Sequence, residues 1–336
     1  MNSLERLAAT ITFGDADRVP VVAQVFAHAA TVAGVDVDDY VRDGETIARC
    51  QIAALKRYGY DAVFSVMDVN VETEAVGSVL DYRSNQYPIV KRHAFSDNRM
   101  TLETVPDPNS AGRMPEMLKA LRILRRELGD EVPVVGCVLG PFTLATQLLG
   151  LENALYLAID DPGKLESVMD FATDVVIEFG KAQIDSGAHL PVVFDPSASP
   201  AVVPSRFFRE FELPRLGRLF EELSSAGALA KWLHIAGPAV SILPYYADAG
   251  ATIANFDYCV TPQAAMTGLP GICVNGNIKS LSFVESKPSE IALQAANLLD
   301  TFQDRNGFIL SSGCEIPPES SPENIAAMVN AVRMKR

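Results

Sequence analysis

Short apolar runs alternate with longer amphipathic stretches along the whole chain. Each apolar run is bounded by Gly, Pro or Asp, which is typical of strands buried on both faces of a parallel sheet. These runs predict strands at Val19–Phe26, Asp61–Val66, Val132–Val138, Pro191–Asp195, Leu229–Ile235, Thr252–Phe256, Gly271–Asn275 and Gly307–Ser311.

The stretches between these runs repeat their apolar residues at helical spacing. Within one of them Leu165, Val168, Ala172 and Val175 form a stripe that suits packing against a sheet. The same pattern predicts helices at Glu45–Tyr58, Met114–Glu127, Pro162–Ile184, Ser205–Ser225, Ser289–Gln303 and Pro322–Arg333.

Strands that alternate with helices in this way predict an α/β protein, a (β/α)8 TIM barrel. A doubly wound open sheet is the alternative. Residues 68–106 interrupt the alternation with VETEAVGSVLDY and YPIVKRHAF, which predict a β-hairpin insertion after the second strand. The sequence shows no low-complexity linker and no internal repeat, so we expect residues 1–336 to form a single domain.

One segment, Val132–Leu151, has no charged residue and is long enough to span a bilayer. Proline and glycine interrupt it, however, most clearly at the pair Gly140–Pro141. A buried strand, a turn and the start of a helix explain it better. The N-terminus has Glu5 and Arg6 where the apolar core of a signal peptide would begin.

Composition and charge exclude some classes of function. The chain of 336 residues has 28 Lys and Arg against 42 Asp and Glu, a formal charge of −14. That balance argues against a protein that binds nucleic acid through a basic surface. Five cysteines without regular spacing predict no disulfide framework, which favours a reducing, cytoplasmic location.

The active site of a TIM barrel lies at the C-terminal ends of its strands. Several polar or reactive residues follow the predicted strand ends: Asp68, Glu72, Glu74, Asp195, His234, Asp257, Asn275, Gly276 and Cys314. Each also has a simpler interpretation. A lone His or Cys is commonly just buried, and an Asp at a strand end commonly caps a turn. The spacing alone therefore leaves their roles open.

Five motifs together carry a resemblance to a known family: LHIAG, VVFDPSAS, NFDYCV, VNGNI and SSGCEIPPESSPENI. They resemble the uroporphyrinogen decarboxylase superfamily, and the last resembles its corrinoid-linked branch, the methylcobamide:coenzyme M methyltransferases. That resemblance implies a barrel that moves a methyl group between a methylcobamide and a small acceptor such as a thiol or a folate. It also implies zinc as cofactor and a separate corrinoid protein as partner, while the acidic charge and the interrupted apolar segment already argue against nucleic acid and a membrane as partners.

Carried over to this chain, the resemblance implies His234 and Cys314 as zinc ligands, with Asp257 as a third ligand or a base. The branch has a further cysteine where this chain has Ala236. Three protein ligands still suffice for a catalytic zinc, which keeps one position open for substrate. Cys259 is a possible substitute ligand, whereas Cys273 lies within a predicted strand.

Two further roles and several alternatives complete the prediction. Asp195 would orient the reacting groups, while Asn275 and Gly276 would shape the pocket. Alternatively, the transfer uses no zinc, or the barrel only binds a ligand or partner. A decarboxylase of porphyrinogens would need an arginine cluster after the first strand to bind carboxylates. Here DRVPVVAQVFAHAATVAG offers only Arg18, which argues against that reaction.

Overall fold

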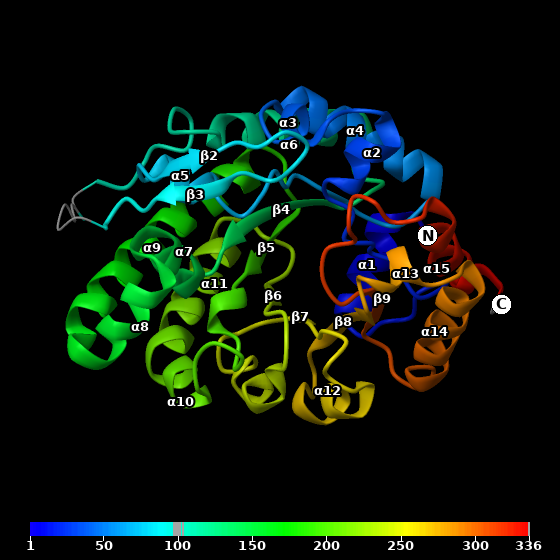
Figure 1. The fold of residues 1–336 in the computed structure, drawn as a ribbon. Helices are drawn as coiled ribbons and strands as arrows, with labels where there is room; N and C mark the ends of the chain where they lie inside the picture. Colours follow the sequence, from blue (N-terminus) through cyan, green and yellow to red (C-terminus); the bar gives the residue numbers. More distant parts are fainter. Residues whose placement is uncertain (97–101, 103, 335–336) are drawn as a thin grey trace.

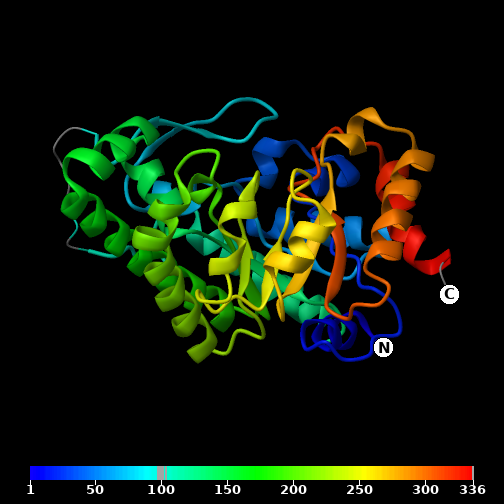
Figure 2. The ribbon, with the colours of Figure 1, turned by 90° about the horizontal axis from the view of Figure 1, so that it is seen from below.

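The structure is a computed structural model that describes residues 1–96, 102 and 104–334. Its centre is a curled, parallel sheet in the order β1-β4-β5-β6-β7-β8-β9 (Figures 1 and 2). The strands are β1 (Val63–Phe64), β4 (Val134–Leu139), β5 (Leu190–Phe194), β6 (Trp232–His234), β7 (Ile253–Asn255), β8 (Cys273–Ile278) and β9 (Phe308–Ser312). Each lies within or beside a predicted strand, so the prediction of an α/β fold with a parallel sheet is confirmed.

The prediction of a regular strand at Val19–Phe26 is wrong. This segment lies between the two edges of the sheet, where Val21 forms an isolated bridge with Leu310 of β9. On the other side the Asp61 N–H donates to the Val21 carbonyl at 2.7 Å. The Val21 N–H donates to the carboxylate of Asp61 rather than to a neighbouring strand, at 2.8 Å. The Asp61 side chain thus replaces the backbone carbonyl that would accept from Val21 in a regular strand. The segment still lies between β9 and β1 and is hydrogen-bonded to residues on both sides.

Helices surround the sheet (Figure 1). They are α1 (Ser3–Ile11), α2 (His28–Ala33), α3 (Val37–Tyr40), α4 (Gly44–Tyr58), α5 (Val71–Ala75), α6 (Met114–Leu128), α7 (Pro141–Leu149), α8 (Leu151–Asp160), α9 (Pro162–Asp185), α10 (Ser205–Phe207), α11 (Leu213–Ser225), α12 (Pro262–Gly268), α13 (Ser282–Glu285), α14 (Pro288–Thr301) and α15 (Pro322–Met334). The predicted helices are all present. The one expected at Ser205–Ser225 is interrupted by a π-helical turn, η2 (Phe208–Glu212), because Pro214 has no N–H for regular helical bonding.

The stretch predicted as an insertion contains more than strands. Helix α5 comes first, and β2 (Val79–Asp81) then pairs antiparallel with β3 (Ile89–Arg92). Residues 97–101 and 103 of this stretch lie outside the described residues. The two short strands stand apart from the central sheet, so they are free to cover one end of it (Figure 1).

The uncharged segment forms β4, a turn at Gly140 and α7, as the sequence predicts. A Cβ atom at Gly140 would lie 2.2 Å from Cγ of Asp195, so this close approach requires glycine. In the described part of the chain, no single helix is long and apolar enough to cross a membrane. Helices α7 and α8 pass that test only as a pair, and they are bent by 106°.

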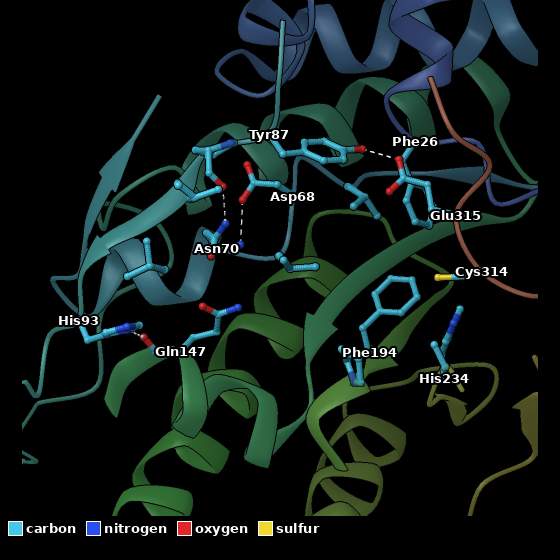
Figure 3. A pocket seen from close by; sticks show the side chains of 17 residues that line it. Phe26, Asp68, Asn70, Tyr87, His93, Gln147, Phe194, His234, Cys314 and Glu315 are labelled. Atoms are coloured by element: carbon cyan, nitrogen blue, oxygen red, sulfur yellow. Dashed lines mark hydrogen bonds between the residues drawn. The ribbon is translucent and has the colours of Figure 1, made fainter. Parts of the chain in front are cut away.

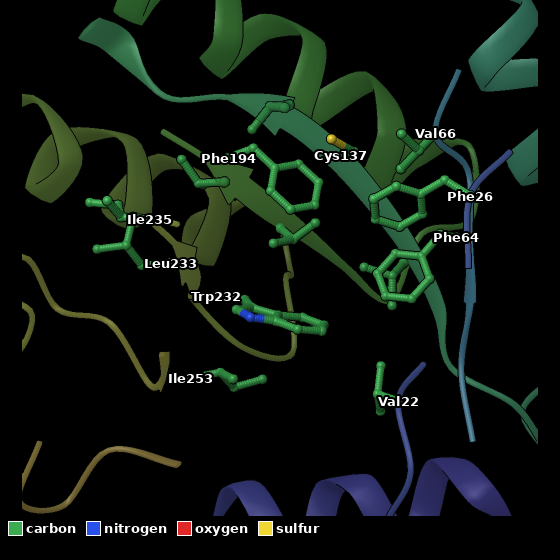
Figure 4. Packing of buried hydrophobic residues seen from close by; sticks show 14 of the residues in the cluster. Val22, Phe26, Phe64, Val66, Cys137, Phe194, Trp232, Leu233, Ile235 and Ile253 are labelled. Atoms are coloured by element: carbon green, nitrogen blue, oxygen red, sulfur yellow. The ribbon is translucent and has the colours of Figure 1, made fainter. Parts of the chain in front are cut away.

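Aromatic side chains fill the interior of the curled sheet (Figure 4). The Phe26 ring packs edge-on against Phe64 at 5.1 Å and against Phe194 at 5.8 Å, measured between ring centroids. Phe64 in turn lies 6.0 Å from Trp232. Because Phe26 and Phe194 also line the cavity described next, this aromatic layer forms its floor.

Candidate active site

A cavity of about 580 Å³ opens at the C-terminal ends of the strands (Figure 3). The barrel and the β2–β3 pair both contribute to its wall. Its lining residues are Phe26, Val66, Asp68, Val69, Asn70, Tyr87, Pro88, Ile89, Val90, His93, Gln147, Phe194, Pro196, His234, Ala236, Cys314 and Glu315. This is the end of the sheet where the sequence predicts the active site, and its volume suits a small molecule.

One wall of the cavity contains a buried ion pair. Asp68 follows β1, and its carboxylate accepts hydrogen bonds from Nη1 of Arg113 at 2.5 Å and from the Asn70 N–H at 2.8 Å. The Arg113 guanidinium also donates to Glu74 at 2.6 Å. Burial nevertheless raises the pKa of Asp68 above its ordinary value. Asp68 is therefore held rigidly and partly neutralised from behind the wall.

A second carboxyl group lies across the cavity. Glu315 accepts a hydrogen bond from the hydroxyl of Tyr87, which reaches over from the segment between β2 and β3 (Figure 3). Burial raises the pKa of Glu315 to about 7. This contact joins the segment after β9 to the insertion, so it fixes the distance between these two walls of the cavity.

His234 and Cys314 both line this cavity (Figure 3), and the His234 ring packs edge-on against Phe194 with 4.7 Å between ring centroids. Burial lowers the pKa of His234 to about 3, so its ring is neutral, and its Nδ1 atom has no hydrogen-bond partner among the described residues. Burial raises the pKa of the Cys314 thiol to about 11. The structure therefore brings a neutral imidazole and a protonated thiol to one cavity, and the role of these two residues as zinc ligands stays a prediction.

Asp257 is placed differently. It does not line the cavity, and its two carboxylate oxygens accept from the Gly237 N–H at 2.9 Å and the Tyr258 N–H at 2.6 Å. Ala236 contributes only a methyl group to the lining. Within the residues that the structure describes, no three His, Cys, Asp or Glu side chains come together to hold a metal ion. As placed, these residues do not fit a zinc ion with three protein ligands, and zinc binding by His234, Asp257 and Cys314 stays a prediction.

Asp195 lies behind the wall rather than in it. It is fully buried, and its Oδ1 accepts from the Thr143 hydroxyl at 2.6 Å and the Thr143 N–H at 2.9 Å. The carboxyl of Glu212 lies beside it, and burial raises the pKa of both groups. Asp195 therefore positions α7 and the turn after β5, next to the cavity-lining Pro196.

The remaining predicted site residues pack inside the barrel. The Asn275 side chain accepts a hydrogen bond from Nδ2 of Asn255 at 3.2 Å, and a Cβ at Gly276 would lie 2.4 Å from the Phe256 carbonyl oxygen. Neither residue is among those that line the cavity. Their role in shaping a pocket stays a prediction.

Sequence reasoning missed five polar lining residues: Asn70, Tyr87, His93, Gln147 and Glu315. Glu315 had a signal, since it directly follows Cys314 in the motif SSGCEIPPE. Tyr87 had none, because its place over the cavity depends on how the insertion folds back.

The family follows from a comparison over the full chain. A family model described as Uroporphyrinogen decarboxylase (URO-D) matches residues 2–334. The chain belongs to the uroporphyrinogen decarboxylase family. Methyltransferases are prominent among the relatives that it matches within this family, and uroporphyrinogen decarboxylases match it as well.

Two relatives and one solved structure show where the chain is placed within the uroporphyrinogen decarboxylase family. It is 28% identical to the methylated-thiol–coenzyme M methyltransferase of Methanosarcina mazei, covering 99% of this chain and 89% of that one. It is 28% identical to the methylcobamide:CoM methyltransferase MtaA of Methanosarcina barkeri, covering 85% and 84%. A solved methyltransferase from Methanosarcina mazei superposes with a TM-score of 0.90 at 26% identity, over 100% and 99% of the two chains. The predicted resemblance to the methyltransferase branch is confirmed.

The family name does not by itself assign decarboxylation. Arg18, the arginine in the segment where decarboxylases were expected to have a cluster, donates to Asp61 at 2.7 Å. Asp61 lies just before β1, at the end of the sheet opposite the cavity. No arginine or lysine is present among the described residues of the cavity wall. A substrate with several carboxylates therefore lacks counter-charges here.

Proposed function

We propose that this protein transfers a methyl group between a methylcobamide, carried by a separate corrinoid protein, and a small acceptor such as a thiol or a folate. The observation that carries the proposal is the joint presence of His234 and Cys314 at one cavity beyond the strand ends. The full-length similarity to methylcobamide-dependent methyltransferases supports it.

The cavity would bind the acceptor and keep water away from it. Phe26 and Phe194 supply an apolar floor, and His234, neutral at physiological pH, stands beside the space where the methyl group would enter. A thiol acceptor reacts as the thiolate after losing its proton to solvent. Its sulfur forms a bond to the methyl carbon while the cobalt–carbon bond breaks and leaves its electron pair on cobalt. Orientation and exclusion of water are what these residues contribute.

Spectroscopy of methylcobalamin tests the proposal, because loss of its methyl group changes its absorption. We expect the purified protein to speed transfer to a thiol at least about a hundredfold, the usual scale for orientation and general catalysis. His234→Ala should abolish most of this rate, whereas His189→Gln, remote from the cavity, is the matched control. A wild-type rate equal to that without protein, with thiols and folates alike, would leave a ligand-binding barrel as the conclusion.

Metal analysis tests the zinc prediction separately. If His234 and Cys314 are oriented as ligands, Ala236→Cys should bind zinc more tightly than the native chain, since sulfur is a favoured zinc ligand. Ala236→Ser is the matched control. Equal zinc content in all three proteins would show that the site is not arranged for zinc.

A further inference from the structure

The cavity wall contains carboxyl groups but no lysine or arginine among its described residues. Its carboxyl residues are Asp68 and Glu315. An anion that enters such a cavity leaves water without gaining a counter-charge. Burial of an unpaired charge is strongly unfavourable, so the identity of the wall limits what can bind.

The one buried guanidinium near the wall is already engaged. Arg113 donates from Nη1 to Asp68 at 2.5 Å and to the Val41 carbonyl at 2.8 Å, and from Nε to Glu74 at 2.6 Å. Its Nη2 donates to Asp68 at 3.2 Å. The basic residues of β3, Lys91 and Arg92, are exposed and do not line the cavity. No described lysine or arginine side chain is left to meet an anionic ligand inside, and Nδ1 of His93, which lines the cavity, already contacts the Gln147 carbonyl oxygen at 2.7 Å.

Most of the wall is apolar, and its polar groups suit an uncharged partner. The Gln147 side chain of α7 points into the cavity (Figure 3), with no hydrogen bond from its amide to another described residue. An amide offers both a donor and an acceptor, which matches a hydroxyl, an ether or a carbonyl group. The aromatic rings of Phe26, Phe194 and Tyr87 also tolerate a cation, because their faces attract positive charge.

We propose that this cavity binds a methyl donor or acceptor whose enclosed part is uncharged or cationic, and that it rejects one that must place a sulfonate or a carboxylate inside the cavity. The inference rests on the proposed function, because it names the substrate class of the same site. It also separates this chain from its coenzyme M-named relatives, since coenzyme M is a short thiol that ends in a sulfonate.

Three thiols of equal length test the inference. Coenzyme M ends in a sulfonate, 2-mercaptoethanol in a hydroxyl and cysteamine in an ammonium group. Rates of transfer from methylcobalamin are compared per thiolate, because the three thiols differ in acidity. We expect kcat/KM for coenzyme M to be at least about tenfold below that for 2-mercaptoethanol, an effect typical of a buried uncompensated charge. Equal or faster reaction with coenzyme M would overturn the inference.

A charge-adding variant sharpens the test. Gln147→Lys places a cation in the wall, so we expect it to raise the preference for coenzyme M over 2-mercaptoethanol by about tenfold. Gln147→Met is the matched control, because it has similar length and no charge, and should leave the preference as in the wild type. If Gln147→Lys leaves the preference between coenzyme M and 2-mercaptoethanol unchanged, the charge of this wall does not determine which thiol is accepted.

Calorimetric measurement of thiol binding tests the charge preference even if the protein transfers no methyl group. If neither a thiol nor a folate is methylated by any of these proteins, the proposed function fails. The heats of binding of the three thiols to the wild-type protein then still decide the charge preference. Binding of coenzyme M as tight as that of 2-mercaptoethanol, or no binding of 2-mercaptoethanol and cysteamine, overturns the inference.

Discussion

Two buried carboxyl sites lie at opposite ends of the barrel and are treated very differently. Asp61, just before β1, accepts hydrogen bonds from Arg6 at 2.8 Å, from Arg18 at 2.7 Å and from the Ser3 hydroxyl at 2.8 Å. Asp195, just after β5, has Glu212 beside it and no ion pair to a described basic side chain. Both aspartates are fully buried. Asp61 has two arginine partners, whereas Asp195 lies beside a second carboxyl group, and burial raises the pKa of both Asp195 and Glu212.

The difference indicates how the two ends divide their tasks. The end with Asp61 closes the sheet, because Asp61 also accepts from the N–H of Val21, the residue that bridges to β9. The end with Asp195 stands behind the cavity and holds uncompensated acid, which costs stability. An aspartate that stabilises the fold is therefore paired with arginines, whereas an aspartate that stands behind the cavity is left without a basic partner.

The strongest way to break this comparison is Asp61→Ala. Removal of the carboxylate leaves the guanidinium groups of Arg6 and Arg18 buried without a shared partner, so we expect a loss of about 3–5 kcal/mol in the free energy of unfolding. Urea denaturation followed by circular dichroism measures it. Asp15→Ala, which removes an exposed carboxylate in the loop after α1, is the control. A loss below about 1 kcal/mol would show that the ion pairs do not hold the sheet closed.

At the other end, Thr143→Val should cost about 2 kcal/mol, because it removes a donor to Asp195 and an acceptor for the Ser197 N–H. Thr143→Ser keeps the hydroxyl and should cost much less. The same denaturation curves compare the two. Equal losses would mean that the methyl group, which only Thr143→Ser removes, stabilises the fold as much as the hydrogen bonds that only Thr143→Val removes.

Glu212→Gln tests whether the raised pKa of Glu212 makes the stability of the protein depend on pH. The folded pKa of Glu212 is raised above its unfolded value, so between the two values the folded protein holds a proton that the unfolded chain has lost. Stability then falls as pH rises, by up to about 1.4 kcal/mol per pH unit. The variant should lose this slope and become more stable than the wild type above about pH 5. Glu221→Gln, at an exposed position of α11, should keep the slope, and a slope shared by all three proteins would refute the assignment.

The smallest effect is expected at Asp17→Asn. Asp17 is partly exposed and pairs with Nε of Arg6 at 2.6 Å, while Arg6 keeps its bond to Asp61. We expect a loss of about 0.5 kcal/mol that shrinks at high salt. Denaturation at low and high ionic strength measures it. A loss as large as that of Asp61→Ala would make the whole cluster, rather than its buried part, responsible for stability.

The sequence predicted the strands and long helices well where burial alone decides them. β5 is a continuous apolar run, β9 begins as one, both are buried along their whole length, and α9 has an apolar stripe several turns long. It failed at Val19–Phe26, where the pattern suits a strand but the side chain of Asp61 takes the hydrogen bond of Val21. Periodicity does not record which group satisfies a backbone N–H.

The candidate site was predictable only in part, for a similar reason. His234 and Cys314 follow strand ends, so topology brings them together at the cavity. Asp257 follows one as well, but backbone N–H groups of the adjoining turns engage both of its oxygens. Tyr87 comes from the insertion, whose path over the barrel depends on long-range packing that no local pattern encodes.

The insertion that carries Tyr87 has a consequence for how this barrel can diversify. Tyr87, Pro88, Ile89, Val90 and His93 all line the cavity, yet β2 and β3 pair only with each other and not with the central sheet. Mutations there alter the substrate chamber without disturbing the ladder of the barrel. The scaffold and its selectivity can therefore evolve, or be engineered, as nearly independent modules, and exchanging residues 79–93 between relatives is a direct route to new substrates.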